Sequence, residues 1–331
     1  MKKIYAILLS ALAALTFSAC MGSTPDVSGN NAQQDIRIFT VDNTDGKISA
    51  ATIEKAFEDT GFSIDGNNNM NAPFKPRFGK TYYKTYHLFT VHNADLTAKL
   101  VKKSTSIGLL SPLSMSLYSN RDDDTSKGIT MNISSLTLRG MSRITQIPMT
   151  DPDLIAYQAL LTKALEAALP GGHFVSLDYK MVAPLNKSLA TTFAVELGGD
   201  NEDDILENKD DFEAEFEGEM EPIGFLFPGF IDLGSEFADV GNEEYDYYDT
   251  YSVCKLDVIF PIHQSHPEVG AFAPCTFYVY KKKGDPITHM GFPSVDNWIQ
   301  STDLDVNDKK TFGTLIEAQK LFVDTVNSVT E

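Results

Sequence analysis

The chain has 331 residues, and its 27 Lys and Arg against 46 Asp and Glu give a formal net charge of −19 at pH 7. Length alone predicts about two domains. So acidic a chain offers no basic face to a nucleic acid, and its charge opposes electrostatic binding to anionic lipid. We therefore exclude a nucleic-acid-binding protein and interpret the acidity as a source of solubility.

Residues 1–19 have the order of a secretory signal peptide. Lys2 and Lys3 form a positive start, residues 4–17 are almost entirely apolar, and small residues precede Cys20. The 14 residues of this apolar run are too few to span a bilayer, which needs about 20. The pattern predicts export to the periplasm and cleavage before Cys20.

Cys20 is the predicted site of lipidation. The sequence Phe17-Ser18-Ala19-Cys20 resembles a lipobox, although an aliphatic residue usually stands where Phe17 is. An acyl chain on Cys20 would anchor the protein in a lipid bilayer, and Met21 in place of Asp favours the outer membrane over the inner one. The alternative is an ordinary signal peptide with an incidental cysteine. Residues 20–34, rich in Gly, Ser and Asn, predict a flexible tether.

Residues 35–172 are predicted to form a first folded module. Strands are expected at 36–41, 82–91, 113–118 and 129–133, and a first helix at 49–60 that Gly61 ends in a left-handed conformation. A last helix begins at Asp151, with Pro152 in its first position. The expected buried positions of this last helix are Leu154, Tyr157, Leu161, Leu165 and Ala168.

Residues 173–331 are predicted to form a second module with the same order of elements. A strand-like run at 189–197 precedes an acidic helix near 203–217, and further strand-like runs lie at 251–260 and 274–280. The apolar positions of the final helix are Leu315, Ala318, Phe322, Val326 and Val329. Their spacing equals that in the first module, so the two final helices are expected to bury equivalent stripes.

Short motifs recur in the same order in both halves of the chain. Tyr-Tyr-x-Thr-Tyr occurs at 82–86 and 247–251, and Gly-x3-Pro-x5-Tyr begins at Gly108 and at Gly270. A collinear series of matches indicates an internal duplication. The sequence therefore predicts an α+β protein of two modules, each a small, mainly antiparallel sheet with helices on one face. A pseudo-twofold pair within one chain would replace a homodimer, which favours a monomer.

Four motifs carry a resemblance to a known family. They are Gly61-Phe62, Val91-His92-Asn93-Ala94, Gly108 to Pro112, and Tyr118-Ser119-Asn120. With them, each copy resembles the bacterial family catalogued as domain of unknown function 302, over most of 36–170 and more weakly over 180–329. The chain departs from the family's Phe-Gly-Asn-Pro turn, where it has Tyr118-Ser119-Asn120-Arg121 and Tyr280-Lys281-Lys282-Lys283. The resemblance implies the fold and brings no established activity.

Two cysteines remain once Cys20 is assigned to lipid. Cys254 and Cys275 both lie in strand-like runs, and an exported protein meets an oxidising compartment. We predict a disulfide between them, which would contribute roughly 3 kcal/mol through loop closure. The alternative is a pair of free thiols on opposite faces of the sheet, a geometry that a disulfide cannot join.

Histidines are the candidate metal ligands. His263 and His266 form a His-x2-His pair in a stretch expected to be a loop, and imidazole suits copper, zinc or nickel. His92 joins the candidates because it falls where the resembled family has a histidine. The competing interpretation is that all three are surface or hydrogen-bonded histidines.

Other sequence features do not indicate chemistry. Twelve carboxylates between residues 200 and 221 are typical of a solvated helix face, with weak calcium binding as the alternative. Ser252 and Lys255 fit Ser-x-x-Lys, but that chemistry needs a helical turn between them and the stretch is strand-like. No phosphate-binding loop, dinucleotide motif or nucleophile elbow occurs.

The sequence thus predicts a non-enzymatic, lipid-anchored periplasmic protein. Its modules are expected to bind a small molecule or an envelope partner in the groove between them, since interfaces between modules are common pocket sites. One alternative is a metal-binding protein that uses His263 and His266, with His92. The other is a hydrolase of unrecognised type. The sequence identifies no cofactor.

Overall fold

The computed structural model describes residues 34–122, 129–175, 177, 179, 190–305, 307, 308 and 310–330. The signal peptide, Cys20 and nearly all of the predicted tether lie outside these described residues. The chain forms two antiparallel sheets with helices packed on them, so the predicted α+β class is confirmed. None of the helices in the described ranges is both long and apolar enough to cross a membrane.

The first module contains a six-stranded sheet in the order β2-β3-β4-β5-β1-β6. Its strands are β1 (Ile36–Asp42), β2 (Ser63–Asn69), β3 (Tyr86–His92), β4 (Leu113–Ser119), β5 (Thr130–Leu136) and β6 (His173–Val175). Its helices are α1 (Ala50–Thr60), α2 (Asn71–Phe78), α3 (Ala94–Val101), α4 (Leu138–Thr145) and α5 (Pro152–Ala168), with the 3-10 helix η1 (Thr105–Leu110). Because β6 pairs with β1, the first sheet extends just past the expected boundary at residue 172.

The second module repeats this arrangement in a five-stranded sheet of order β7-β11-β10-β9-β8. Its strands are β7 (Ala190–Val195), β8 (Leu226–Asp232), β9 (Tyr245–Cys254), β10 (Cys275–Lys282) and β11 (Thr288–Pro293). Its helices are α6 (Glu202–Met220), α7 (Leu233–Asp239), α8 (Leu256–His263), α9 (Asp296–Ser301) and α10 (Thr311–Thr330), with the 3-10 helix η2 (Pro267–Phe272). The predicted tandem, similar modules are confirmed.

Local sequence signals set the helix ends. The Ser49 hydroxyl accepts a hydrogen bond from the Thr52 amide at the start of α1, and Gly61 ends that helix with φ of 101°. Asp151 caps α5, where Pro152 occupies the first turn as predicted. The expected stripe of α5 is buried throughout, as are the first four of the five expected positions of α10.

Two expectations about the strands are wrong. The run at 251–260 is a strand only as far as Cys254, and α8 follows from Leu256. Six of the eight residues of α8 are buried, which leaves too little polar periodicity to distinguish a short helix from a strand. Likewise the run at 82–91 enters the sheet only at Tyr86.

The register of the sheets also corrects the alignment of the tyrosine motifs. Tyr86 lies opposite Tyr118 in the first sheet, and Tyr248 lies opposite Tyr280 in the second. Tyr86 and Tyr248 are thus equivalent, and both they and the glycines Gly108 and Gly270 are 162 residues apart. The two Tyr-Tyr-x-Thr-Tyr strings are therefore not equivalent residue by residue, because closely spaced tyrosines permit more than one alignment.

The modules join through an exchange of their 3-10 helices. η1 packs on β10 and β11 of the second sheet, and η2 packs on β3, β4 and β5 of the first. The Ser114 hydroxyl donates to the Pro274 carbonyl at 2.7 Å, and the equivalent Thr276 hydroxyl donates to the Pro112 carbonyl at 3.0 Å. Reciprocal contacts of equivalent residues define a twofold relation, so the predicted pseudo-twofold pairing is confirmed.

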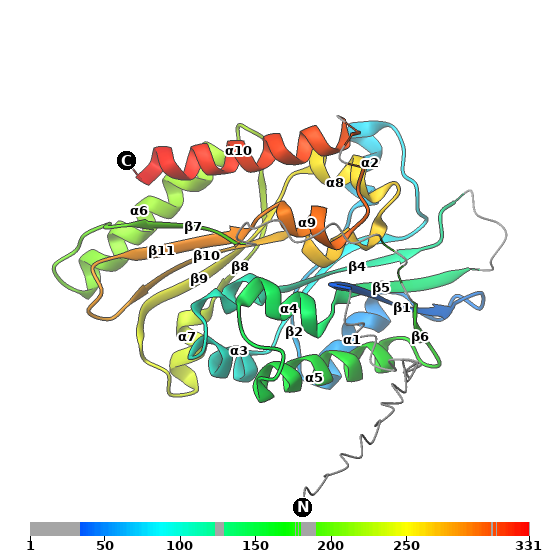
Figure 1. Cartoon of the computed structure of the whole chain (residues 1–331), viewed down its shortest axis with the longest axis horizontal. Coiled ribbons are helices and arrows are strands. Elements are labelled where there is room, and N and C mark those ends of the chain that lie inside the picture. Colours follow the sequence, from blue (N-terminus) through cyan, green and yellow to red (C-terminus); the bar gives the residue numbers. More distant parts are fainter. Residues whose placement is uncertain are drawn as a thin grey trace, which may run out of the picture.

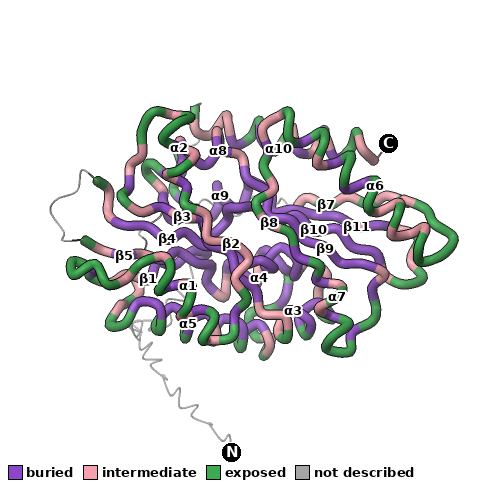
Figure 2. Tube along the Cα trace, turned by 180° about the vertical axis from the view of Figure 1, so that it is seen from behind, coloured by how far each residue is buried: buried purple, intermediate pink, exposed green. Residues whose placement is uncertain are grey.

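Each sheet therefore has two unlike faces. Phe89 packs its ring against Phe57 of α1, whereas Tyr86, on the opposite face of β3, donates to the Pro267 carbonyl of η2 at 3.2 Å. Helices α1 and α5 lie along one side of the molecule and α6 and α10 along the other, with the sheets between them (Figure 1). Buried residues concentrate in the strands, and exposed ones on the outer helices (Figure 2).

Candidate ligand cavity

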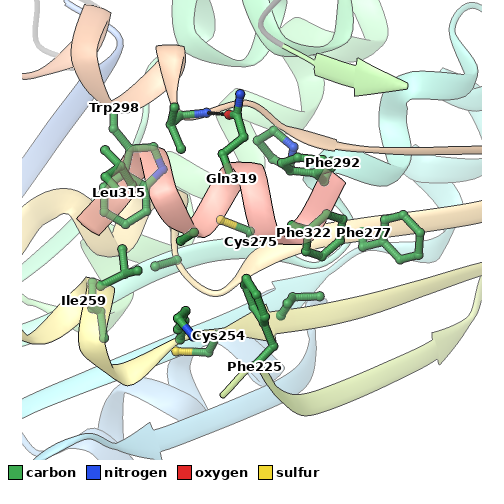
Figure 3. A pocket seen from close by; sticks show the side chains of 17 residues that line it. Phe225, Cys254, Ile259, Cys275, Phe277, Phe292, Trp298, Leu315, Gln319 and Phe322 are labelled. Atoms are coloured by element: carbon green, nitrogen blue, oxygen red, sulfur yellow. Dashed lines mark hydrogen bonds between the residues drawn. The ribbon is translucent and has the colours of Figure 1, made fainter. Parts of the chain in front are cut away.

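A cavity lies inside the second module, between the outer face of its sheet and α8, α9 and α10 (Figure 3). The centre of a water molecule could lie anywhere within a volume of about 70 Å³ inside the cavity. On the same measure, one buried water needs roughly 10–15 Å³. The lining residues are almost all apolar: Phe225, Val253, Cys254, Lys255, Val258, Ile259, Ala273, Cys275, Phe277, Phe292, Pro293, Val295, Trp298, Leu315, Ala318, Gln319 and Phe322. Such a lining favours an apolar ligand over water.

A single position of the duplicated helix distinguishes the two modules at this cavity. The matched stripes of α5 and α10 place Ala318 where the first module has Tyr157. Tyr157 is 1% exposed, its ring centre lies 6.0 Å from that of Phe62, and its hydroxyl lies 3.5 Å from the Leu110 carbonyl. The tyrosine packs between α5 and η1 in the first module, whereas the smaller Ala318 borders the cavity beside α10.

Few polar groups reach the cavity. The side-chain Oε1 of Gln319 accepts a hydrogen bond from the Val295 backbone amide at 2.7 Å, which holds α10 to the start of α9. Burial raises the pKa of the Cys254 and Cys275 thiols to about 12, so both are neutral at physiological pH. Lys255, directly before α8, contributes the remaining polar side chain. The cavity therefore offers apolar surface to a ligand, together with one positively charged side chain, that of Lys255.

The predicted groove between the modules is closed. Leu109 and Leu110 of η1 meet Ala271 and Phe272 of η2 there, and water centres can occupy only about 10 Å³ of the gap. Such a gap is at the lower limit for one water molecule. At this contact the exchanged 3-10 helices fill the space in which the sequence predicted a ligand groove.

The predicted disulfide is absent, since Cys254 and Cys275 are both free thiols. Cys275 lies opposite Val253 in the β9–β10 ladder. Cys254 is one residue further along, and successive side chains of a strand point to opposite faces. Both thiols nevertheless line the same cavity. The structure thus has a pair of free thiols, as the alternative to the disulfide expected, without placing them far apart.

His92 is an ion-paired residue that links the modules. Its Nδ1 lies 2.8 Å from Asp65 Oδ1, and its Nε2 lies 3.0 Å from Glu236 Oε1 of the second module. Although burial alone would lower it, the hydrogen bonds with Asp65 and Glu236 raise the pKa of His92 to about 9. Burial also raises the pKa of Asp65, against the effect of the imidazole. The imidazolium form is thus favoured at neutral pH, with both ring nitrogens occupied.

His263 is a buried core residue and not part of a loop. It ends α8 with no exposed surface, and its Nδ1 donates to the Phe260 carbonyl at 2.6 Å. Its ring centre lies 4.7 Å from those of Phe74 and Tyr86, and its Nε2 has no hydrogen-bond partner among the described residues. Burial lowers the pKa of His263 to about 4, so the imidazole is neutral within an aromatic cluster.

His266 has a third set of partners. Its Nε2 lies 2.9 Å from Asp303 Oδ1, and its Nδ1 lies 2.9 Å from the Ser265 hydroxyl. Because His92, His263 and His266 each have separate partners, the structure does not bring the predicted metal ligands together. Across the described part of the chain, no three His, Cys, Asp or Glu side chains gather as a metal site would require.

The structure contains a buried pair of carboxylates, Asp249 and Glu213, that no sequence motif predicts. Asp249 of β9 lies 2.9 Å from the ammonium of Lys209, and Glu213 of α6 lies 3.5 Å from it. Burial raises the pKa of both carboxyl groups, and the charge of Asp249 adds to the effect on Glu213. Neither carboxylate lines the cavity. Only the position of Asp249 within a strand of tyrosines could have signalled this pair.

Comparisons with known proteins add little to this site. No family model and no curated protein matches the chain. Among solved structures it is similar to the crystal structure of an uncharacterized conserved protein, DUF302, from Bacillus stearothermophilus. The identity is 16% and the TM-score 0.35, over 44% of this chain and 100% of the other. A likeness of this extent leaves function to be argued from the cavity.

Proposed function

We propose that the chain is a non-enzymatic binding protein that holds a small apolar molecule in the cavity of its second module. The observation that carries the proposal is the apolar cavity beside Ala318, at a position that Tyr157 fills in the first module. Unfilled apolar space forfeits packing contacts and costs stability. A ligand that fills the space would recover those contacts, which supports a binding site here.

The chain carries its own reporter for ligand binding. Trp298 is the only tryptophan in the sequence, it is 3% exposed, and it lines the cavity. Titration with octanol should therefore change the fluorescence of Trp298 in a saturable way. An apolar chain that displaces no ordered water gains the transfer free energy of each methylene, about 0.8 kcal/mol.

Filling the cavity provides the decisive variant. Ala318→Tyr restores the side chain of the first module, so it should abolish the octanol response while the protein stays folded. Ile316→Tyr is the matched control, because it adds the same ring to α10 at a site that is 42% exposed. If Ala318→Tyr binds octanol as the native chain does, the cavity is not the binding site.

The location of this function follows from the sequence signals. We propose that the protein is exported to the periplasm and anchored through an acyl chain on Cys20, with the two modules on a short tether as a monomer. Labelling of cells with radioactive palmitate should mark the native protein. The Cys20→Ala variant should lose the label, and retention of the label would contradict the assignment.

A further inference from the structure

Among the described residues, Lys255 is the only positively charged side chain that lines the cavity. Lys255 lines the cavity, and its Nζ lies 4.9 Å from the centre of the Phe225 ring, which lines it too. The ammonium donates to the Ile223 carbonyl. An ammonium has three N–H donors, and Lys255 takes part in none of the ion pairs formed by the described residues. Donor capacity therefore remains at the cavity.

In the first module, the residue equivalent to Lys255 is Asn93, which caps a helix. Asn93 precedes α3 as Lys255 precedes α8, and the Asn93 side-chain oxygen accepts a hydrogen bond from the Leu96 amide at 3.0 Å. Lysine has no acceptor, and the start of α8 has no side-chain cap. Since Lys255, Val258 and Ile259 all line the cavity, α8 begins beside it. The second module thus replaces a helix cap with a cation at the cavity.

Neighbouring charges do not neutralise this cation. Asp257 is the nearest acidic residue along the sequence, but its Oδ1 already accepts a hydrogen bond from Arg77 Nε at 3.2 Å. Burial lowers the pKa of Lys255, and the charge of Arg77 adds to that effect against the charges of Asp257 and Glu317. A half-buried ammonium without a committed counter-ion is best stabilised by an anion bound next to it.

We propose that the ligand is an amphiphilic monocarboxylate, with its apolar chain in the cavity and its carboxylate paired to Lys255. This inference rests on the proposed function, since the cavity must first accept an apolar chain. The carboxylate would accept hydrogen bonds from the ammonium, and its position would limit how deep the chain enters. A neutral molecule of the same length would keep only the packing.

The test compares ligands that differ only in the head group, with Trp298 fluorescence as the signal. At pH 7, octanoate should bind roughly tenfold or more tightly than octanol, since a hydrogen bond to a charged group contributes about 1.5–3 kcal/mol. Octylammonium should bind more weakly than octanol because its charge repels Lys255. Lys255→Met keeps the apolar stem and should abolish the preference for octanoate while leaving octanol binding intact.

Lys320→Met is the matched control, because Lys320 lies on α10 but is exposed and pairs with Asp324. This variant should retain the full preference for octanoate. If octanol and octanoate bind equally to the native chain, or if Lys255→Met keeps the preference, the carboxylate assignment is overturned and the apolar site stands. If none of the three ligands binds, the proposed function itself fails.

Discussion

The two modules share a framework but differ in what three equivalent positions do. In the first module His92 is ion-paired, Asn93 caps a helix and Tyr157 fills the core. Their counterparts in the second module are Cys254, Lys255 and Ala318, all of which line the cavity. The exchanged 3-10 helices and their reciprocal hydrogen bonds are alike in both. The contacts between the two modules thus stabilise the shared fold. The residues that differ between the modules at the three equivalent positions line the cavity.

The largest expected effect comes from emptying the filled module. Tyr157→Ala should lower the free energy of unfolding by about 3–5 kcal/mol, because it leaves a cavity where a buried ring was. Chemical denaturation measures the change. Ile155→Ala on the same helix is the control, since Ile155 is 45% exposed, and it should change stability by less than about 0.5 kcal/mol. A loss of under about 1 kcal/mol for Tyr157→Ala would show that the ring does not fill this space.

Removing the ion pair between the modules should have the next largest effect. His92→Gln leaves the Asp65 carboxylate buried without its cation, which should cost about 3 kcal/mol at pH 6. Denaturation of both proteins at that pH gives the difference. Equal stabilities would mean that the Asp65–His92–Glu236 contacts contribute nothing to the junction.

The same variant tests a pH dependence. Since the folded pKa of His92 is raised from 6.5 to about 9, its stabilising contribution is complete below pH 6.5 and is lost as the pH rises through about 9. The stability difference between native chain and His92→Gln should therefore shrink across that window. His87→Gln is the control, because burial lowers the pKa of His87. A difference that stays constant across the window contradicts a charged His92.

Substitution of the glycines at the contact between the modules should lower stability by less than the loss of the Tyr157 ring or of the His92 ion pairs. A Cβ at Gly270 would lie 2.4 Å from Ser116 Cβ and 2.9 Å from its backbone, and one at Gly108 would lie 2.4 Å from Tyr248 Oη. Alanine at either glycine should cost about 1–3 kcal/mol. The cost should be larger at Gly270, where backbone is in the way.

Gly218 of α6 provides the opposite expectation, because a Cβ there meets nothing within 4 Å. Gly218→Ala should stabilise the protein by roughly 0.5–1 kcal/mol through helix propensity. Thermal unfolding of the three variants measures the series. If Gly218→Ala destabilises the protein as the alanine variants of Gly108 and Gly270 do, the loss of stability is not specific to the interface between the modules.

Much of the fold was predictable because its signals are local. Gly61, Asp151 and the stripes of α5 and α10 act through backbone geometry and helical spacing, which the sequence displays directly. The structure of α8 was not predictable, because a short helix with six of its eight residues buried shows little polar periodicity. Nor was the position of Cys254, which depends on a one-residue register in the ladder.

The site was visible in the sequence only in part. The matched stripes align Ala318 with Tyr157, but the sequence does not tell whether neighbouring side chains close around the smaller alanine, because that depends on tertiary packing. The histidines illustrate the same limit: spacing suggested that His263 and His266 share a ligand, whereas burial and partners separate them. Side-chain roles across two modules are set by contacts between distant segments.

Diffraction from crystals under xenon pressure would show whether the second module holds an apolar cavity, because xenon enters dry apolar cavities. We expect anomalous density for xenon beside Trp298, Ala318 and Phe322, none beside Tyr157, and loss of the site in Ala318→Tyr. An empty second module, or xenon bound between η1 and η2 instead, would contradict this expectation.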